Sequence, residues 1–349
     1  MRRIALHAGL CLLLLACTPP ASVRPAADTA VATLYAEHYH DGAYFNPWAP
    51  FEVSWVNLLR AYLQPNPHDR SRPPQVPQQA LNPELLSQPV TTPTLSWLGH
   101  ATVAIQAGDD LLLTDPHLSD GVPLYARKTP PAVALAQLPD PRLALISHNH
   151  YDHLDEDTVM GLSAGVHWLV PKGLAAWFEA RGRRVSELDW WQSISDGPWT
   201  LTCVPMQHWS RRWGQAKNET LWCGWLIEGH GSRYFFAGDS GYFHGFAEIG
   251  RQLGPIDVAL LPIGAYAPRW FLGYQHMAPE EALQAFVDLR ARYLLPVHWG
   301  AFDFAQEPLD EPPRALMRAA EAAGLGAAVK VLPVGGRFEL PPADQLMRK

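Results

Sequence analysis

The most informative stretch of this chain is His148-Asn149-His150-Tyr151-Asp152-His153. It directly follows an aliphatic run, residues 143–147, that has the composition of a buried strand. Three imidazoles and a carboxylate on one turn at a strand end can be bent inward toward metal ions. A His-rich surface loop is the other interpretation, but three His beside an aliphatic strand are costly unless something holds them. The stretch therefore predicts a metal site at the edge of a sheet.

Further candidate ligands stand where later β-patterned runs end: His208, Asp239 and His298. Asp239 lies in the tight turn Gly238-Asp239-Ser240-Gly241, where a carboxylate is well suited to bridge two cations. Each of the three, taken singly, is explained equally well as a capping or core polar residue. Together with the stretch at 148–153 they predict a site for two metal ions.

From residue 94 onward, short β-patterned runs are interleaved with helical patterns and show no repeat of fixed length. This order predicts an α/β layered domain over residues 94–349, although periodicity alone does not distinguish three layers from four. The strands are expected at residues 95–98, 102–106, 111–114, 143–147, 199–204, 221–228, 234–237, 258–263 and 293–297. The clearest helices are expected at residues 172–180, 279–292 and 312–323.

The N-terminus has the pattern of an export signal. Arg2 and Arg3 precede residues 4–16, which are apolar except for His7 and too few to span a bilayer as a permanent helix. Residues 1–16 are therefore predicted to be a signal peptide. They end in Leu14-Leu15-Ala16-Cys17, which resembles a bacterial lipobox, so Cys17 is expected to be lipidated and to begin the mature chain. An ordinary signal peptide and an uncleaved anchor are the alternatives.

This pattern predicts a location in the bacterial cell envelope, lipid-anchored and facing the periplasm. Thr18 rather than Asp follows Cys17, which by resemblance to the known sorting pattern favours the outer membrane. Residues 17–30 are rich in Ala and Pro and are expected to be a lipid-anchored tether. Residues 31–93, which end in a Pro-rich stretch, are expected to be an extension packed on the core.

Composition limits the function further. The chain has 349 residues, 48% of them hydrophobic, which is enough for a sizeable core. Its 27 basic and 34 acidic residues give a net charge of -7, so nucleic acid is not expected as a partner. Cys203 and Cys223 lie in apolar, strand-like runs, and either a disulfide or two buried thiols fits them. The sequence does not indicate an oligomeric state.

The His-x-His-x-Asp-His motif, with the later His, Asp and His, resembles the metallo-β-lactamase superfamily. The resemblance implies an αββα sandwich with two zinc ions, although iron or manganese fits a His and carboxylate set almost as well. It also implies the role of each residue: His148, His150 and His208 would hold the first metal, Asp152, His153 and His298 the second, and Asp239 would bridge both. Asp115, in Leu113-Thr114-Asp115-Pro116, matches the superfamily's early Asp, which orients the ligand loop.

A narrower resemblance covers most of residues 45–312. The motifs are similar to those of the N-acylphosphatidylethanolamine-hydrolysing phospholipase D family, which implies a zinc phosphodiesterase that cleaves such lipids into an N-acylethanolamine and phosphatidic acid. The chain departs from the family in its N-terminal segment and in the loops that shape the acyl-chain site. The motifs are Phe45-Asn46-Pro47-Trp48, Trp97-Leu98-Gly99-His100-Ala101-Thr102, Glu187-Leu188-Asp189-Trp190-Trp191, Phe235-Phe236-Ala237-Gly238-Asp239, Pro262-Ile263-Gly264-Ala265-Tyr266, Pro268-Arg269-Trp270-Phe271, Gln275-His276 and His298-Trp299-Gly300.

The same resemblance suggests catalytic groups and substrate contacts. Asp152 and His276 are the expected catalytic residues, His276 by binding the phosphate or protonating the leaving group. A structural His is the alternative for His276. Fourteen Trp is a high count, and Trp209 and Trp270, with Arg269, are expected to contact a membrane phospholipid, although most Trp would simply pack the core.

Two other functions fit the sequence. Another hydrolase of the same fold, such as a lactonase or β-lactamase, is one, but β-lactamases tend to use a Cys ligand, and neither Cys203 nor Cys223 stands at a ligand position. The other is a non-catalytic metal-binding envelope lipoprotein. A complete ligand set with an open coordination position argues against it.

Overall fold

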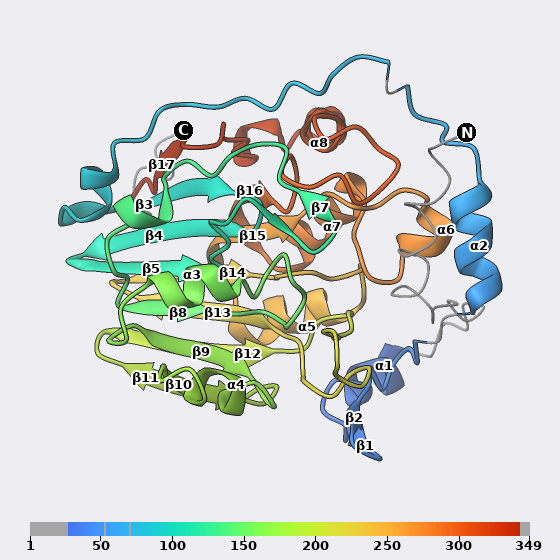
Figure 1. Cartoon of the computed structure of the whole chain (residues 1–349), viewed down its shortest axis with the longest axis horizontal. Coiled ribbons are helices and arrows are strands. Elements are labelled where there is room, and N and C mark those ends of the chain that lie inside the picture. Colours follow the sequence, from blue (N-terminus) through green and yellow to red (C-terminus); the bar gives the residue numbers. More distant parts are fainter. Residues whose placement is uncertain (1–26, 52–53, 70, 343–349) are drawn as a thin grey trace.

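The computed structural model describes residues 27–51, 54–69 and 71–342, and it shows two β-sheets stacked face to face with helices on both outer sides (Figure 1). This arrangement confirms the predicted α/β class and the αββα sandwich. The signal peptide, Cys17 and most of the predicted tether lie outside the described residues. The last residues of that tether, 27–30, belong to a helix.

The first sheet has seven strands in the order β10-β9-β8-β5-β4-β3-β17. The neighbours from β10 to β5 are parallel, and those from β5 to β17 are antiparallel. Its strands are β3 (Val90–Gly99), β4 (Thr102–Gly108), β5 (Asp110–Thr114), β8 (Leu143–Leu145), β9 (His167–Pro171), β10 (Arg184–Leu188) and β17 (Arg337–Glu339).

The second sheet has six strands in the order β11-β12-β13-β14-β15-β16, antiparallel as far as β14 and parallel from there. Its strands are β11 (Ser193–Asp196), β12 (Trp199–Val204), β13 (Gly224–Gly229), β14 (Ser232–Phe236), β15 (Ile256–Pro262) and β16 (Ala291–Val297). Two small hairpins lie outside both sheets: β1 (Tyr39–His40) with β2 (Ala43–Tyr44), and β6 (Gly121–Val122) with β7 (Tyr125–Ala126).

The helices are short, and several of them pack on the outer faces of the two sheets. Helices α5, α7 and α8 contribute Phe246, Phe286 and Leu316 to the larger core cluster, which also fills the space between the sheets. A second cluster packs the other face of the first sheet. The helices are α1 (Ala27–Thr33), α2 (Trp55–Leu63), α3 (Glu156–Gly161), α4 (Ala175–Glu179), α5 (Gly245–Leu253), α6 (Arg269–Leu272), α7 (Pro279–Asp288) and α8 (Glu311–Ala322).

The alternation of side chains explains why the central strands are apolar on both faces. In β8, Leu143 and Leu145 point into the larger cluster and Ala144 into the other. In a strand, successive side chains point to opposite faces, so every position of a strand between two apolar layers favours an apolar side chain. Strand β8 therefore reads as a continuous aliphatic run in the sequence.

Two expected elements end at least two residues earlier in the structure. Helix α7 begins with Pro279 as expected, but it ends at Asp288 rather than at residue 292, because Arg290 has a left-handed φ of 54° that turns the chain into β16. Strand β8 stops at Leu145, and the Ser147 N–H donates to Asp115 Oδ1 at 2.6 Å. The hydrogen-bond ladder of β8 ends here because the buried Asp115 carboxylate accepts the Ser147 N–H in place of a strand carbonyl.

The described part of the N-terminal extension lies against the core. The Trp191 indole donates to the Leu34 carbonyl at 2.8 Å, and the Asn46 side chain donates to the His208 carbonyl at 3.0 Å. The second contact joins the extension to the loop that carries a candidate ligand. No helix in the described part of the chain is long and apolar enough to cross a membrane.

Candidate metal centre

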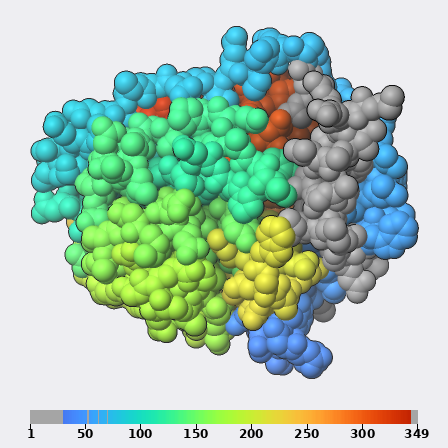
Figure 2. Space-filling view, in the orientation of Figure 1, coloured from blue at the N-terminus to red at the C-terminus, as the bar shows by residue number. Residues whose placement is uncertain are grey.

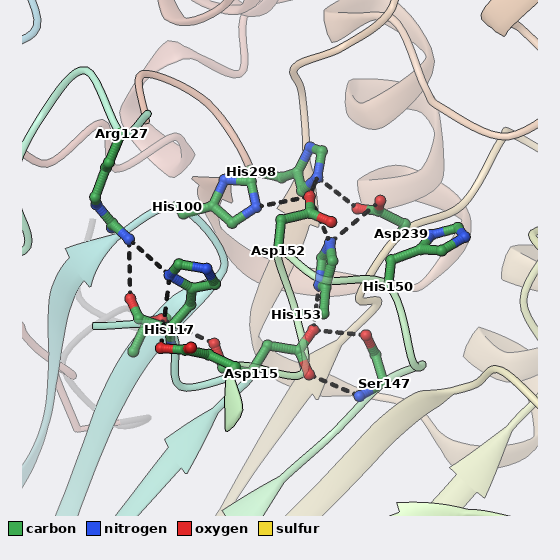
Figure 3. Close-up of polar contacts among 12 residues, drawn as sticks. His100, Asp115, His117, Arg127, Ser147, His150, Asp152, His153, Asp239 and His298 are labelled. Atoms are coloured by element: carbon green, nitrogen blue, oxygen red, sulfur yellow. Dashed lines mark hydrogen bonds and ion pairs between the residues drawn. The ribbon is translucent and has the colours of Figure 1, made fainter. Parts of the chain in front are cut away.

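Seven candidate ligands meet at one end of the sandwich, where each follows a strand. Figure 3 labels His150, Asp152, His153, Asp239 and His298 among them. The carboxyl ends of parallel strands in stacked sheets reach the same edge, so loops far apart in sequence come together there. The stretch at 148–153 follows β8, His208 follows β12, Asp239 follows β14 and His298 follows β16.

Three imidazoles form the first cluster. His148 Nε2 lies 2.8 Å from His150 Nδ1, and His208 Nε2 lies 3.2 Å from the same His150 nitrogen. Zinc–nitrogen bonds of 2.0–2.1 Å at tetrahedral angles place neighbouring nitrogens about 3.3 Å apart. The three nitrogens therefore converge at close to the spacing that one metal ion requires, and the residues predicted for the first metal are brought together.

Hydrogen bonds fix the tautomers of two of these imidazoles. His148 Nδ1 donates to Ser147 Oγ at 2.9 Å, and His208 Nδ1 donates to the Gln275 carbonyl at 3.0 Å. With the proton on Nδ1, each ring presents the lone pair of Nε2 to the cluster.

The second cluster contains Asp152, His153 and His298, together with His100. Asp152 Oδ2 lies 3.4 Å from Nε2 of both His153 and His298, and 3.1 Å from His100 Nε2. The three residues predicted for the second metal are therefore adjacent. Nε2 of His153 and of His298 is buried and has no hydrogen-bond partner in the described part of the chain. Buried nitrogens left without partners in this way fit a site built for a cation.

Asp239 lies between the clusters. Its Oδ2 is 3.2 Å from His153 Nε2 and 3.9 Å from His208 Nε2, and its Oδ1 is 3.1 Å from His298 Nε2. The carboxylate therefore faces nitrogens of both clusters, which is the geometry that a bridging ligand needs. Gly238, which precedes it, has φ of 58°, and a Cβ there would lie 2.3 Å from Ser147 Cβ, so only glycine fits this turn.

Asp115 supports the ligand loop of residues 148–153 through hydrogen bonds to Ser147 and His153. Its carboxylate accepts hydrogen bonds from the Ser147 N–H at 2.6 Å, from Ser147 Oγ at 2.5 Å and from His153 Nδ1 at 2.5 Å. Burial raises the pKa of this carboxyl group, while His153 and Ser147 act against that shift. The structure thus places Asp115 where it orients His153 and, through Ser147, His148.

The ionisation of the cluster follows from burial and from the two carboxylates. Burial opposes a charge on His298, but Asp239 and Asp152 outweigh it and raise the pKa of His298 to about 9. Burial lowers the pKa of His208 to about 4 and that of His150 well below its usual range. The carboxylates thus retain protons on neighbouring imidazoles, and a metal ion that binds here displaces those protons.

His276 lies beside this set and was predicted to stand outside it. Its Nδ1 is buried and unpaired among the described residues, 3.7 Å from Asp239 Oδ2, and it is close enough to Asp239 and His298 to share a metal with them. Burial lowers the pKa of His276 to about 3. Its role as an auxiliary group stays a prediction.

The three expected substrate contacts fall in two places. Trp209 lines a groove over the clusters, and its ring centroid lies 4.5 Å from that of His150. Arg269 instead donates to the His276 carbonyl at 2.7 Å and pairs with Glu281 at 2.5 Å, and Trp270 donates to Gln64 of α2 at 2.6 Å. In this geometry Arg269 supports the His276 loop and Trp270 holds Gln64, the residue after α2, while a direct contact of either with substrate stays a prediction.

His100 is the member of the site that the sequence did not identify. It is 2% exposed, lies in the turn between β3 and β4 with φ of 53°, and accepts the His298 N–H on its carbonyl at 3.0 Å. Asp115 and His298 also have positive φ, and such strain clusters at functional sites. The family motif at residues 97–102 contains His100 and was the available signal, but no role was assigned to this residue. Cys203 and Cys223 are buried free thiols rather than a disulfide.

Comparison with known proteins agrees with this geometry. Residues 111–299, more than half of the chain, match the model of the beta-lactamase superfamily domain. An uncharacterized protein of Mycobacterium tuberculosis is 38% identical over 329 residues, which cover 89% of this chain and 87% of that protein. N-acyl-phosphatidylethanolamine-hydrolyzing phospholipase D 1 of Caenorhabditis elegans is 38% identical over 240 residues, which cover 62% of this chain and 67% of that protein.

Solved structures show the same fold. Igni18, a metallo hydrolase from the archaeon Ignicoccus hospitalis, aligns with a TM-score of 0.56 at 22% identity, covering 72% of this chain and all of that one. The fold and the ligand clusters define a metal-dependent hydrolase. The chain belongs to the metallo-β-lactamase superfamily, in the family that includes the N-acyl-phosphatidylethanolamine-hydrolyzing phospholipases D.

Proposed function

We propose that this protein is a zinc-dependent phosphodiesterase of the phospholipase D type, which hydrolyses N-acylphosphatidylethanolamine-like lipids to an N-acylethanolamine and phosphatidic acid. The observation that carries the proposal is a groove of about 390 Å³ that opens onto both ligand clusters. Its walls combine two basic side chains, Arg211 and Arg212, with apolar and aromatic ones. These are Val122, Pro123, Leu124, Tyr125, Tyr151, Trp209, Trp213, Leu272 and Phe304.

This combination suits a phospholipid. The phosphodiester needs positive charge beside the reacting phosphorus, and the acyl chains need an apolar wall that runs away from it. Arg212 is engaged elsewhere, because it donates to the carbonyls of Asn149 and Leu154 and lies over the Tyr151 ring. Arg211 is therefore the residue of this pair that we assign to the phosphate.

The residues that would hold the metals are those of the two clusters, with Asp239 between them. Two divalent ions there would lower the pKa of a bound water toward about 7 and neutralise charge on the phosphoryl oxygens. The three-imidazole cluster is the donor set that zinc prefers. Iron and manganese are distinguished by metal analysis of the purified protein.

His276 faces the reacting region from the groove wall. Burial lowers the pKa of His276 to about 3, so at pH 7 its imidazole is neutral and is a poor proton donor for a leaving group. It can still donate an N–H hydrogen bond to a phosphoryl oxygen. Of its two predicted roles, this protonation state favours phosphate binding. Asp152 lines the same groove and is ionised, because the nearby imidazoles hold its pKa well below the usual range despite burial.

The reaction balances as a simple hydrolysis. The oxygen of water forms a bond to phosphorus, the bond from phosphorus to the ethanolamine oxygen breaks, and the proton of water passes to that oxygen. Incubation of the zinc-loaded protein with N-acylphosphatidylethanolamine in heavy-oxygen water, followed by mass spectrometry, tests this. We expect equal amounts of the two products, with the heavy oxygen in the phosphatidic acid. Release of fatty acid, or hydrolysis of lactones without cleavage of the lipid, would overturn the proposal.

For the location of the protein, we propose a lipid anchor on Cys17 in the bacterial envelope, facing the periplasm and most consistent with the outer membrane. The support is the apolar run of residues 4–16 that ends in Leu14-Leu15-Ala16-Cys17. Intact-mass analysis of envelope-purified protein should find acyl chains on an N-terminal Cys17. An unmodified N-terminus at any other residue contradicts it.

A further inference from the structure

Helix α2 carries its apolar side chains on the outside. Trp55 is 64% exposed and Leu63 66%, and Val56 and Leu59 are exposed as well. Trp55, Leu59 and Leu63 are spaced four residues apart, so they share one face of the helix. Soluble proteins seldom expose several large apolar side chains together unless that surface contacts something.

Two more exposed apolar side chains stand at the groove. Leu124, at the tip of the β6–β7 hairpin, is 65% exposed, and Trp213, in the loop of residues 209–217, is 68% exposed. Both belong to the groove lining, so their exposed parts lie at its mouth. Trp55, Leu63, Leu124 and Trp213 are called the rim residues below.

Helix α2 is joined to the groove through α6. The Trp270 indole donates to Gln64 at the end of α2, and the Arg60 guanidinium lies 4.6 Å from the centre of the Trp270 ring. Leu272, on the same short helix as Trp270, lines the groove. In Figure 2 the blue-green atoms of the β6–β7 hairpin, the yellow atoms of the 209–217 loop and the blue atoms of α2 are all visible from one side.

Charge distinguishes these segments from the rest of the chain. Residues 54–64 contain Arg60 and no acidic residue, and residues 209–217 contain Arg211, Arg212 and Lys217 and no acidic residue. The whole chain has a net charge of -7. Positive charge and exposed apolar groups thus occur together on α2 and on the 209–217 loop, which complements an anionic lipid surface.

We propose that α2, the tip of the β6–β7 hairpin and the 209–217 loop form a docking face for an anionic membrane surface, with the rim residues inserted among the lipids. The proposal rests on the proposed function, since it supplies the route by which a lipid reaches the groove. A bilayer pressed against this face leaves the mouth open to its own molecules. A second copy of the chain over the same residues would cover the mouth, so the lipid surface is the occupant that the geometry favours.

Spin labels on the full chain test the docking face. Single variants Trp55→Cys, Leu63→Cys, Leu124→Cys and Trp213→Cys are labelled, with Val287→Cys on α7 as the matched control because Val287 is also exposed. Each is reconstituted in vesicles of phosphatidylcholine alone and of phosphatidylcholine with an equimolar amount of phosphatidylglycerol. The unsubstituted chain, labelled in parallel, reports any signal from native cysteines.

In the anionic vesicles the rim labels should contact dissolved oxygen more than a water-soluble nickel chelate, and the label at 287 should show the reverse. Rim labels as accessible to nickel as position 287 would overturn the proposal. Spin–spin broadening at rim positions without contact with oxygen would also overturn it, by assigning the face to a second copy. Equal immersion of the rim labels in both vesicle types would overturn the claim that the docking face prefers an anionic surface.

Turnover supplies an independent measurement. The double variant Trp55→Ser with Leu63→Ser should lose on the order of tenfold of its rate on substrate in anionic vesicles, while Val287→Ser should not. A short-chain diester dispersed as monomers should be hydrolysed equally by all three proteins. Because the labels report docking without any turnover, immersion without hydrolysis would reject the proposed function alone, and hydrolysis without immersion would reject the docking face alone.

Discussion

His100 Nε2 lies 3.1 Å from Asp152 Oδ2, although 51 residues separate them in the chain. The imidazole is 2% exposed, packs edge-on against Phe302 with 4.9 Å between ring centroids, and is held on its carbonyl by the His298 N–H. The His100 side chain therefore positions one oxygen of Asp152, and the loop that carries His298 holds the His100 backbone. Removal of such a partner is expected to loosen the second cluster while leaving the three-imidazole cluster intact.

His100→Ala should weaken binding of one of two metal ions by about 10–100-fold, the usual effect of losing a group that orients a ligand. Competition with a chromophoric chelator measures this affinity, and His230→Ala, remote from the site beside Asp110, is the control. In the cobalt-substituted protein a changed visible spectrum would show that His100 binds the metal directly. Two metals held with unchanged affinity would contradict any role for His100 in the site.

Hydrolysis should depend on the metal and not on a thiol. Chelation should abolish turnover and zinc should restore it, whereas Cys203→Ala and Cys223→Ala should keep at least most of it. The Cys203 thiol is buried and donates to the Leu188 carbonyl at 3.7 Å, and Cys203 belongs to none of the ligand clusters of the described residues. Loss of turnover in a folded, metal-loaded thiol variant would contradict the metal mechanism.

Much of the site could be predicted from sequence because its ligands mark strand ends. An aliphatic run followed by polar residues is a local signal, and seven such positions were found at 148, 150, 152, 153, 208, 239 and 298. The layered class followed from the same local patterns. The order of strands in the two sheets, by contrast, depends on pairings between distant segments that periodicity does not encode.

The parts that were missed are held by long-range contacts. His100 contributes through Asp152 and His298, and nothing near residue 100 in the sequence records those partners. The position of α2 depends on Trp270, more than 200 residues away. Arg269 was expected to contact a phospholipid; in the structure it pairs with Glu281 on the following helix, and its contact with substrate stays a prediction. The burial of these side chains and the partners that they contact depend on the folded chain, so the nearby sequence does not predict them.

The N-terminal extension, which contains His38, should be held less firmly on the core when the carboxylate of Asp189 loses its charge. Its carboxylate lies 2.7 Å from His38 Nε2 and 3.1 Å from Lys172 Nζ. Partial burial raises the pKa of Asp189, but hydrogen bonds from His38 and Lys172 outweigh it and lower the pKa to about 2. The unfolded value is about 3.9, so the stabilisation is present above about pH 4 and is lost as the pH falls toward 2.

Asp189→Asn should therefore lower the urea midpoint at pH 7, and the difference from the unchanged chain should shrink below about pH 4. Glu321→Gln, on an exposed position of α8, is the control for a lost negative charge. A difference that stays constant between pH 7 and pH 3 would show that the ionised form of Asp189 is not what holds the segment.

The last prediction separates Asp239 from His276, which lie 3.7 Å apart between Oδ2 and Nδ1. Asp239 faces nitrogens of both clusters, so Asp239→Ala should lose at least one metal and essentially all activity. His276 faces the groove and is expected to act on the phosphate, so His276→Ala should keep both metals and lose about 10²–10⁴-fold in turnover. Metal analysis and turnover of the two purified variants measure this directly. Two metals in Asp239→Ala would reject the bridging assignment, and one metal in His276→Ala would make His276 a ligand, as its distance to Asp239 and His298 permits. Unchanged turnover of a folded His276→Ala would leave it a structural residue.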